Sequence, residues 1–113
     1  MNTYKYVSFN TPDYFGTYFY VKLTETDSEA TFQNFLEDAF TSFQNYVADC
    51  MEGEAYDEHA DEYGHMVDEI GYEEALDEYR NRCYVEKIRD VSENEVPPTE
   101  NPYTTDEGEC IEF

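Results

Sequence analysis

Hydrophobic and polar positions alternate near the start of the chain. From residue 17 to residue 23, the odd positions hold Thr, Phe, Val and Leu, while the even positions hold Tyr, Tyr and Lys. This period of two is typical of a strand with one buried face. Residues 3–9 are rich in Tyr and Val, and Asn-Thr-Pro-Asp at 10–13 is a turn signal. The pattern therefore predicts a β-hairpin, with Gly16 near the bend or at a bulge.

The period changes to that of a helix near Thr26. Thr26 and Glu29 fit a T-x-x-E capping box, and Gly53 suits the C-terminal end of the helix. The apolar residues between these limits follow helical spacing: Phe32, Phe35, Leu36, Ala39, Phe40, Phe43, Tyr46, Val47 and Cys50. We interpret this stripe as core rather than as a cofactor-binding surface.

Two shorter helices and a strand are expected next. Residues 55–70 predict a helix that Gly71 ends or kinks. Its inward face comprises Tyr56, Ala60, Tyr63, Val67 and Ile70. Residues 72–82 predict a third helix with Ala75, Leu76 and Tyr79 inward, and residues 83–91 predict a strand whose apolar members are Tyr84, Val85 and Ile88.

These elements define an α+β fold of the order ββααβ. We expect a small antiparallel sheet, made of the N-terminal hairpin and the later strand, packed on two to three acidic helices. Residues 1–92 form one compact domain in this interpretation. Residues 93–113 form an acidic tail with three prolines, of which part can be ordered.

Charge changes the picture most. The chain has 28 acids against 6 bases and a formal net charge of -22 in 113 residues. Between Glu25 and Glu78 it carries eighteen acids and no Lys or Arg. Acidic disordered chains are poor in aromatics, whereas 18% of this chain is aromatic, which favours a folded protein. Because like charges oppose compaction, we infer that a partner which binds polyanions compensates the repulsion.

Other partners and compartments fit the composition poorly. Direct nucleic-acid binding requires a basic footprint, and acidity disfavours anionic lipid surfaces. The sequence has no apolar run of about 18 residues and no signal-peptide pattern at its start. Three scattered cysteines form no disulfide framework, so reduced thiols in a cytoplasmic protein are expected.

The candidate binding residues are acids that occur as adjacent pairs, several of them four residues apart. On a helix, this spacing makes a row with about 6 Å between steps. We call the following ten residues the acidic ladder: Asp57, Glu58, Asp61, Glu62, Asp68, Glu69, Glu73, Glu74, Asp77 and Glu78. A continuous helix over them would be about 32 Å long, with roughly one carboxylate per 3 Å. One DNA strand presents a phosphate per ~3.4 Å.

The ladder residues are our predicted partner-binding site. Glu37, Asp38 and Asp49 are secondary candidates on the first helix. The alternative interpretation is an acidic face that serves solvation alone. Tyrosines at 56, 63, 72 and 79 interleave with the acids, and we expect most to face inward, although an outward ring could stack on Arg. The bases Arg80, Arg82, Lys87 and Arg89 either pair with tail acids or form a separate contact.

Catalytic and metal-binding patterns are weak. The carboxylate pairs are too many and too alike to single out a general acid and a base, so we expect no enzyme and no catalytic residue. Glu62 and His65 make one Glu-x-x-His step, but His59 has no Glu three residues before it, so a second copy is lacking. No calcium loop or phosphate-binding glycine loop is present, and we expect no cofactor and no bound metal.

The acidic helices without bases and the many tyrosines over residues 25–79 resemble the DNA-mimic inhibitors of phages and mobile elements. These include antirestriction proteins of the Ocr and ArdA kind and acidic anti-CRISPR proteins. The opening, two strands with Gly16-Thr17-Tyr18 before an acidic helix, is similar to the start of ArdA-type proteins. The resemblance implies inhibition by occupying the nucleic-acid site of a defence nuclease, either a CRISPR effector or a restriction enzyme. We expect the chain to act as a monomer or a homodimer. The alternative is an acidic protein that modulates another basic host protein, such as a nucleoid, polymerase or repair factor.

Overall fold

The computed structural model of the chain describes residues 2–52, 60–107 and 111, without the side chains of residues 51 and 52. Its elements are β1 (Thr3–Asn10), β2 (Thr17–Leu23), α1 (Glu29–Glu52), α2 (Asp61–Ile70), α3 (Tyr72–Asn81), β3 (Tyr84–Val91) and a 3-10 helix (Glu93–Glu95). The α+β prediction is confirmed: two strands precede the helices and one strand follows them.

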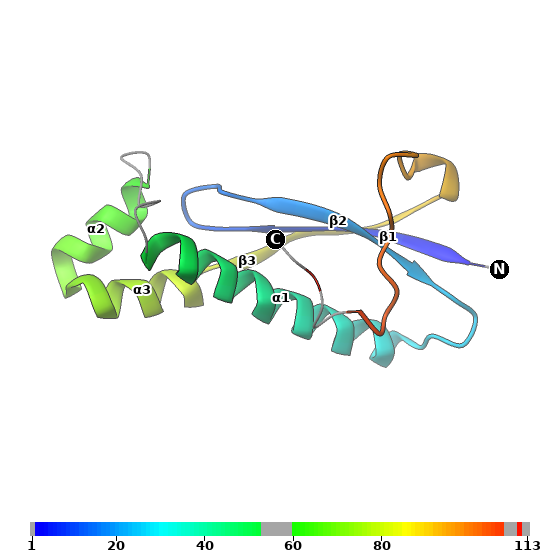
Figure 1. Cartoon of the computed structure of the whole chain (residues 1–113), viewed down its shortest axis with the longest axis horizontal. Coiled ribbons are helices and arrows are strands. Elements are labelled where there is room, and N and C mark those ends of the chain that lie inside the picture. Colours follow the sequence, from blue (N-terminus) through cyan, green and yellow to red (C-terminus); the bar gives the residue numbers. More distant parts are fainter. Residues whose placement is uncertain (1, 53–59, 108–110, 112–113) are drawn as a thin grey trace.

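The three strands form one antiparallel sheet of order β2-β1-β3. Helix α1 covers one face of this sheet, and the α2–α3 pair lies at the end where β1 turns into β2 (Figure 1). The molecule is elongated, with extents of 51 × 25 × 19 Å. The acidic helices α2 and α3 therefore occupy one end of the molecule and α1 extends along it.

Gly16 lies in the tight return from β1 to β2, as the hairpin prediction requires. A Cβ atom there would be 2.8 Å from the Phe9 carbonyl oxygen, which is closer than carbon and oxygen approach without a shift. Only glycine therefore fits this position without moving the strand ends. The register between β1 and β3 also shifts at Ser8/Phe9, which marks a bulge on the other side of β1.

Helix α1 begins at Glu29, and the predicted Thr26–Glu29 capping box is wrong. Ser28 caps the helix instead: its Oγ accepts the Thr31 N–H at 3.1 Å, and the Thr31 Oγ1 accepts the Ser28 N–H at 3.4 Å. The preceding residues form a separate turn, because Asp27 Oδ2 accepts the Thr24 N–H at 2.8 Å. The predicted stop at Gly53 lies outside the described residues.

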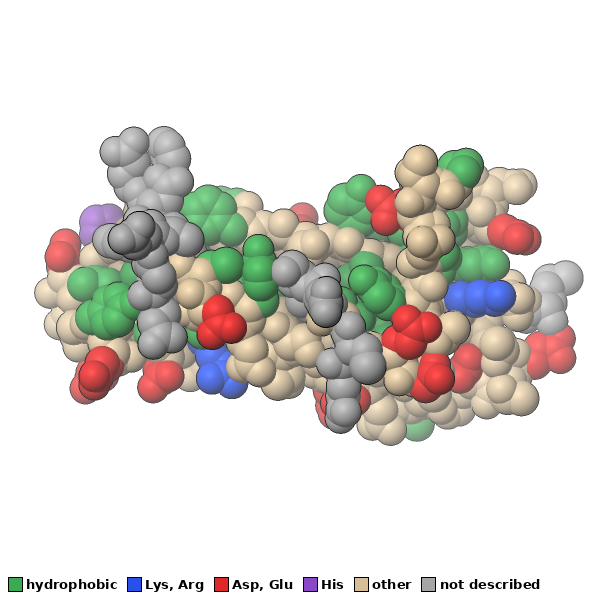
Figure 2. Space-filling view, in the orientation of Figure 1, with side chains coloured by type: hydrophobic (Ala, Val, Ile, Leu, Met, Phe, Trp, Pro, Cys, Tyr) green, Lys and Arg blue, Asp and Glu red, His purple; other side chains and the backbone are tan. Residues whose placement is uncertain are grey.

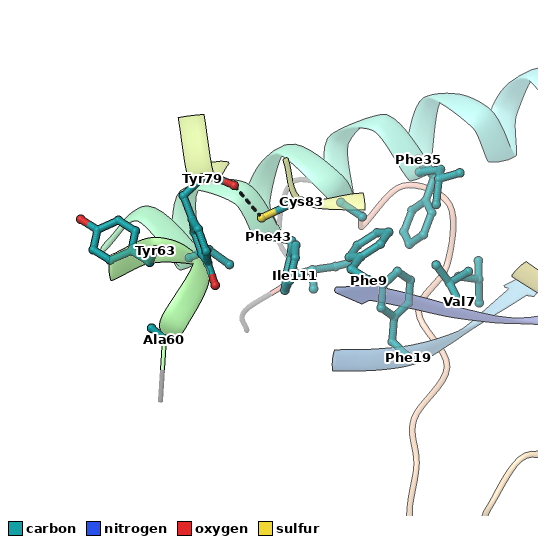
Figure 3. Close-up of a cluster of buried hydrophobic side chains, with 14 of the residues drawn as sticks. Val7, Phe9, Phe19, Phe35, Phe43, Ala60, Tyr63, Tyr79, Cys83 and Ile111 are labelled. Atoms are coloured by element: carbon teal, nitrogen blue, oxygen red, sulfur yellow. Dashed lines mark hydrogen bonds between the residues drawn. The ribbon is translucent and has the colours of Figure 1, made fainter. Parts of the chain in front are cut away.

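The core lies between α1 and the sheet and continues into α2 and α3, and phenylalanine is the most frequent residue of its buried cluster (Figure 3). The ring of Phe9, which is fully buried on the central strand, lies 5.4 Å from Phe19, 5.2 Å from Phe40 and 5.3 Å from Phe43. Burial of each such side chain contributes roughly 1.5–3 kcal/mol. The predicted helical stripe is thus core, except that Tyr46 is 45% exposed and Cys50 is half-buried outside the core cluster.

The described part of α2 differs from the prediction at its end. Ala60 and Tyr63 are buried, as expected, but Ile70 is exposed and Met66 is buried in its stead. Ile70 is the last residue of α2, and the chain turns away at Gly71 before the side chain reaches the core. Helix α3 follows its prediction, since Ala75 and Tyr79 are fully buried and Leu76 packs against the core.

The chain after β3 wraps around the sheet. Residues 93–95 form a 3-10 turn capped by Ser92, and the chain then crosses from the β3 edge to the β2 edge. Tyr103 pairs with β2 in parallel there, donating its N–H to Tyr20 at 2.9 Å and accepting the Lys22 N–H at 2.8 Å. Ile111 lies in the core beyond this point. The described residues of the tail are therefore joined to both the sheet and the core.

A polar network ties the β1–β2 turn to α2 and α3. The Asp13 carboxylate accepts the backbone N–H groups of Glu62 (2.8 Å) and Tyr63 (3.2 Å) and the hydroxyl of Tyr79 (2.9 Å). Asp13 thus caps α2 from a distant segment, while Ala60, at the N-cap position, makes no side-chain cap. The Tyr79 hydroxyl also lies 3.0 Å from Thr11 Oγ1. Burial, aided by Asp13, raises the pKa of Tyr79 well above its ordinary value.

Replacing Tyr79 by Phe tests this network. The variant removes a hydrogen bond to a charged acceptor, so we expect the free energy of unfolding to fall by about 1.5–3 kcal/mol in urea titrations at pH 7. Because the pKa of Tyr79 is raised on folding, its contribution is present below pH 10 and is lost as the pH rises further. The wild-type chain should therefore lose stability above pH 10 more steeply than the variant. Tyr14→Phe, at a side chain that is 78% exposed, is the control and should change stability by less than about 0.5 kcal/mol.

Candidate functional site

The described residues of the acidic ladder lie on the surface of α2 and α3. Eight of its ten residues are described, and Asp57 and Glu58 lie outside the described residues. Seven of the eight are exposed, and Glu78 is half-exposed: Asp61, Glu62, Asp68, Glu69, Glu73, Glu74, Asp77 and Glu78. The ladder is therefore available to a partner.

Gly71 folds the ladder into a helical hairpin, which confirms the predicted break. Its φ of 86° is a conformation that glycine adopts freely and other residues rarely do. The buried sides of the two helices face each other, with the rings of Tyr63 and Tyr79 5.2 Å apart. A single straight ladder of about 32 Å is thus not formed. The carboxylates instead surround one end of the molecule.

Position along each helix separates two groups of ladder acids. Asp61 and Glu62 lie in the first turn of α2, and Glu73 and Glu74 in the first turn of α3, where a negative charge favours the helix dipole. Asp68 and Glu69 lie in the last turns of α2, which holds no base, and there a negative charge opposes the dipole. These two carboxylates gain nothing from the helix dipole, so they carry the stronger functional signal.

The secondary candidates on α1 are exposed as well. Glu37 and Asp38 lie near the middle of the helix, and Asp49 lies near its C-terminal end. At 1.5 Å per residue, about 17 Å of helix separates the first two from Asp49. Gln44 of α1 donates to the Arg80 carbonyl oxygen at 3.0 Å, so the end of α3 adjoins this half of α1. Of these candidates, Asp49 therefore lies on the half of α1 that is next to α3 and its ladder acids.

Charge is segregated between the helices and the strands. The ranges of α1, α2 and α3 hold 13 acids and one base, whereas the ranges of the three strands hold two acids and four bases. On the face shown in Figure 2, acidic side chains lie at the α2–α3 end and along the edge that α1 occupies, and others lie at the opposite end, where the C-terminal segment crosses the sheet. The fold therefore presents a strongly negative helical side and a nearly neutral sheet.

Three of the six bases form ion pairs with acids in the described part of the chain. Arg82 Nε binds Glu78 Oε1 at 2.8 Å, and Lys5 Nζ binds Asp90 Oδ1 at 2.6 Å across the sheet. Arg89 lies 3.8 Å from Glu95, which is one pairing between the basic cluster and the tail acids. Arg82 also reduces the charge at the end of the ladder, so Glu78 is the least available of the eight described ladder acids.

Of the three interleaved tyrosines that the structure describes, two face inward. Tyr63 and Tyr79 are fully buried, Tyr72 is 43% exposed, and Tyr56 lies outside the described residues. Glu62 and His65 line a groove of about 500 Å³ between α2 and α3 that Glu69, Glu78 and Arg82 also border. Among the residues that the structure describes, no group of three or more His, Cys, Asp or Glu side chains could hold a metal ion.

Sequence reasoning missed the residues of the β1–β2 turn. Asp13 was read only as part of a turn signal, although it is the acid that joins the sheet to the ladder helices. Tyr14 and Phe15 received no role, yet they are 78% and 39% exposed beside that junction. The aromatic pair directly before Gly16 was the one signal that could have drawn attention to the turn.

Comparison with known proteins gives no relative. No family model, curated protein sequence or solved structure matches the chain. Within the described residues, no helix is both long and apolar enough to cross a membrane. The site must therefore be interpreted from its own geometry.

Paired substitutions distinguish the two groups of ladder acids. We expect Asp68→Asn with Glu69→Gln to raise the free energy of unfolding by about 0.3–1 kcal/mol per residue, because both charges oppose the helix dipole. Glu73→Gln with Glu74→Gln should lower it by a similar amount. Urea titrations at low ionic strength measure both differences, and 1 M salt should shrink them. Equal effects of the two pairs would contradict the assignment.

Proposed function

We propose that this protein is an anti-defence inhibitor that acts as a polyanionic DNA mimic. It binds the nucleic-acid site of a bacterial defence nuclease, either a CRISPR effector or a restriction enzyme, and excludes DNA. The proposal requires no catalytic group, cofactor or metal. The partner is a basic nucleic-acid-binding protein, and the contact residues are the ladder acids together with Glu37, Asp38 and Asp49.

The segregation of charge carries the proposal. Strands disfavour Asp and Glu in any protein, but if acidity served solvation alone, the helices would carry Lys and Arg among their acids, because both are good helix formers. Instead the helices have 13 acids and one base, and four of the six bases lie in strands. A surface of one sign attracts a partner of the opposite sign and orients it, so that the helical side approaches first.

Acids without a folding benefit support the same conclusion. Asp68 and Glu69 oppose the dipole of α2, and neither has a base in the last turn of that helix. Surface ion pairs are weak, but a base at i,i+4 would at least remove the repulsion. Their retention is explained if a basic groove receives them.

The dimensions are compatible with a phosphate-binding groove. The long extent of 51 Å corresponds to about 15 phosphate spacings of ~3.4 Å along one DNA strand. The narrower extents of 25 and 19 Å are close to the width of a duplex. Charges at the α2–α3 end and along α1 therefore extend over a length comparable to a protein-binding site on DNA.

Neutralising the ladder tests the proposal. All ten ladder acids are replaced by Asn or Gln, and DNA cleavage is measured with a set of purified nucleases that includes a guide-loaded CRISPR effector and restriction enzymes of different types. We expect the wild-type chain to inhibit at least one enzyme, in competition with DNA, and the neutralised variant to lose inhibition. Retained far-ultraviolet circular dichroism shows that the variant is folded.

A matched pair isolates the role of position. Asp68→Asn with Glu69→Gln and Glu86→Gln with Glu93→Gln both change the formal charge from -22 to -20. The first pair should weaken inhibition and lower its salt dependence, while the second, on β3 and the 3-10 turn, should have little effect. Inhibition that survives full neutralisation, or equal effects of the two pairs, would overturn the proposal.

A further inference from the structure

The β1–β2 turn carries an aromatic pair in an unusual setting. Tyr14 has a φ of 64°, and it is the one non-glycine residue of the described chain with a positive φ. Bulky side chains are disfavoured in this left-handed region, where glycine and asparagine are common. A strained residue of this kind persists only where the surrounding structure fixes it.

The surroundings fix this turn firmly. Tyr14 donates its N–H to the Thr11 carbonyl oxygen at 3.0 Å, and the Thr11 Oγ1 accepts the N–H groups of Asp13 (3.3 Å) and Phe15 (3.0 Å). Thr11 itself is fully buried. Gly16 closes the turn against the Phe9 carbonyl. The backbone that presents Tyr14 and Phe15 is therefore held from both sides.

Packing does not explain the choice of tyrosine. The Tyr14 side chain is 78% exposed, and Phe15 is 39% exposed. In the region of the β1–β2 turn, hydrophobic side chains are exposed at the molecular surface (Figure 2). The chain keeps a strained, exposed tyrosine where asparagine would suit the backbone better, so the gain lies outside the folded chain.

The neighbours of the turn indicate the partner's chemistry. Asp13, adjacent to Tyr14, accepts the backbone N–H groups of Glu62 and Tyr63, so the turn that carries the aromatic pair is joined to the first turn of α2, where Asp61 and Glu62 are exposed. Aromatic rings beside carboxylates suit an arginine, whose planar guanidinium stacks on a ring and donates in a fork to an acid. The same pairing occurs within the chain, where the Arg89 guanidinium lies 5.6 Å from the Tyr6 ring centroid.

We propose that Tyr14 and Phe15 form an aromatic contact for arginine side chains of the basic partner, at the edge of the acidic ladder. This inference rests on the proposed function, which supplies the partner, and adds the side chain that the partner presents. The ladder attracts cations of any kind, whereas the aromatic pair distinguishes arginine from lysine.

Two peptides of equal charge test the inference without any nuclease. Deca-arginine and deca-lysine are titrated into the protein by calorimetry at a fixed ionic strength. We expect the wild-type chain to bind deca-arginine about two- to fivefold more tightly than deca-lysine. In Tyr14→Asn with Phe15→Ser, this ratio should fall clearly below the wild-type value, because only the fork to the carboxylates still favours arginine. The deca-lysine affinity and its salt dependence should stay unchanged because no charge is removed.

Two controls complete the test. Tyr18→Ser removes a tyrosine that is 51% exposed on the sheet face opposite α1, and this variant should keep the wild-type affinity ratio.

Tyr14→Asn alone should leave the thermal midpoint of unfolding unchanged or raise it. A lowered midpoint, an unchanged ratio in the double variant, or no arginine preference in the wild type would each overturn the inference. The two claims fail in different experiments. If the proposed function is wrong, no nuclease is inhibited, whatever the ratio of the two peptide affinities.

Discussion

The Asp13 carboxylate holds the acidic helices to the rest of the protein. It accepts two backbone N–H groups at the start of α2 and the Tyr79 hydroxyl of α3, so one side chain from the β1–β2 turn fixes both helices of the hairpin. Without it, the first turn of α2 would lack a side-chain cap and the buried Tyr79 hydroxyl would lose its charged acceptor. The orientation of the ladder acids thus depends on a contact outside the ladder itself.

Repulsion among the acids is opposed mainly by aromatic packing. Phe9 lies at the centre of the core and contacts rings from β2 and α1, while Tyr63 and Tyr79 join α2 to α3. These contacts are insensitive to salt, whereas repulsion between exposed carboxylates is screened over about 10 Å at 0.1 M salt. The balance allows a charge of -22 on a folded domain, provided that the charges stay at the surface.

The sequence predicted the elements whose periodicity is strong. The hairpin strands, the long stripe of α1 and the break at Gly71 were all predicted because alternation, helical spacing and glycine each act locally. The start of α1 was missed because Ser28 and Thr31 compete with Thr26 and Glu29 for the same cap, and the Thr24–Asp27 turn decides between them. The exposed Ile70 was missed because the turn at Gly71 redirects the chain. No local pattern could show that Asp13 would reach α2 and α3, since the contact with Tyr79 spans 66 residues.

The ladder residues were identified from composition, but their arrangement follows from the fold. A charge run fixes only how strongly a partner is attracted, because Coulomb attraction between an acidic surface and a basic groove falls slowly with distance and tolerates many orientations. Selectivity needs short-range contacts that only one register satisfies. The hairpin at Gly71 shortens the ladder, and the rigid β1–β2 turn places Tyr14 at its edge. We infer that the two features have different roles. The carboxylates determine the rate and salt dependence of association, and the aromatic side chains of the turn determine which basic partner stays bound.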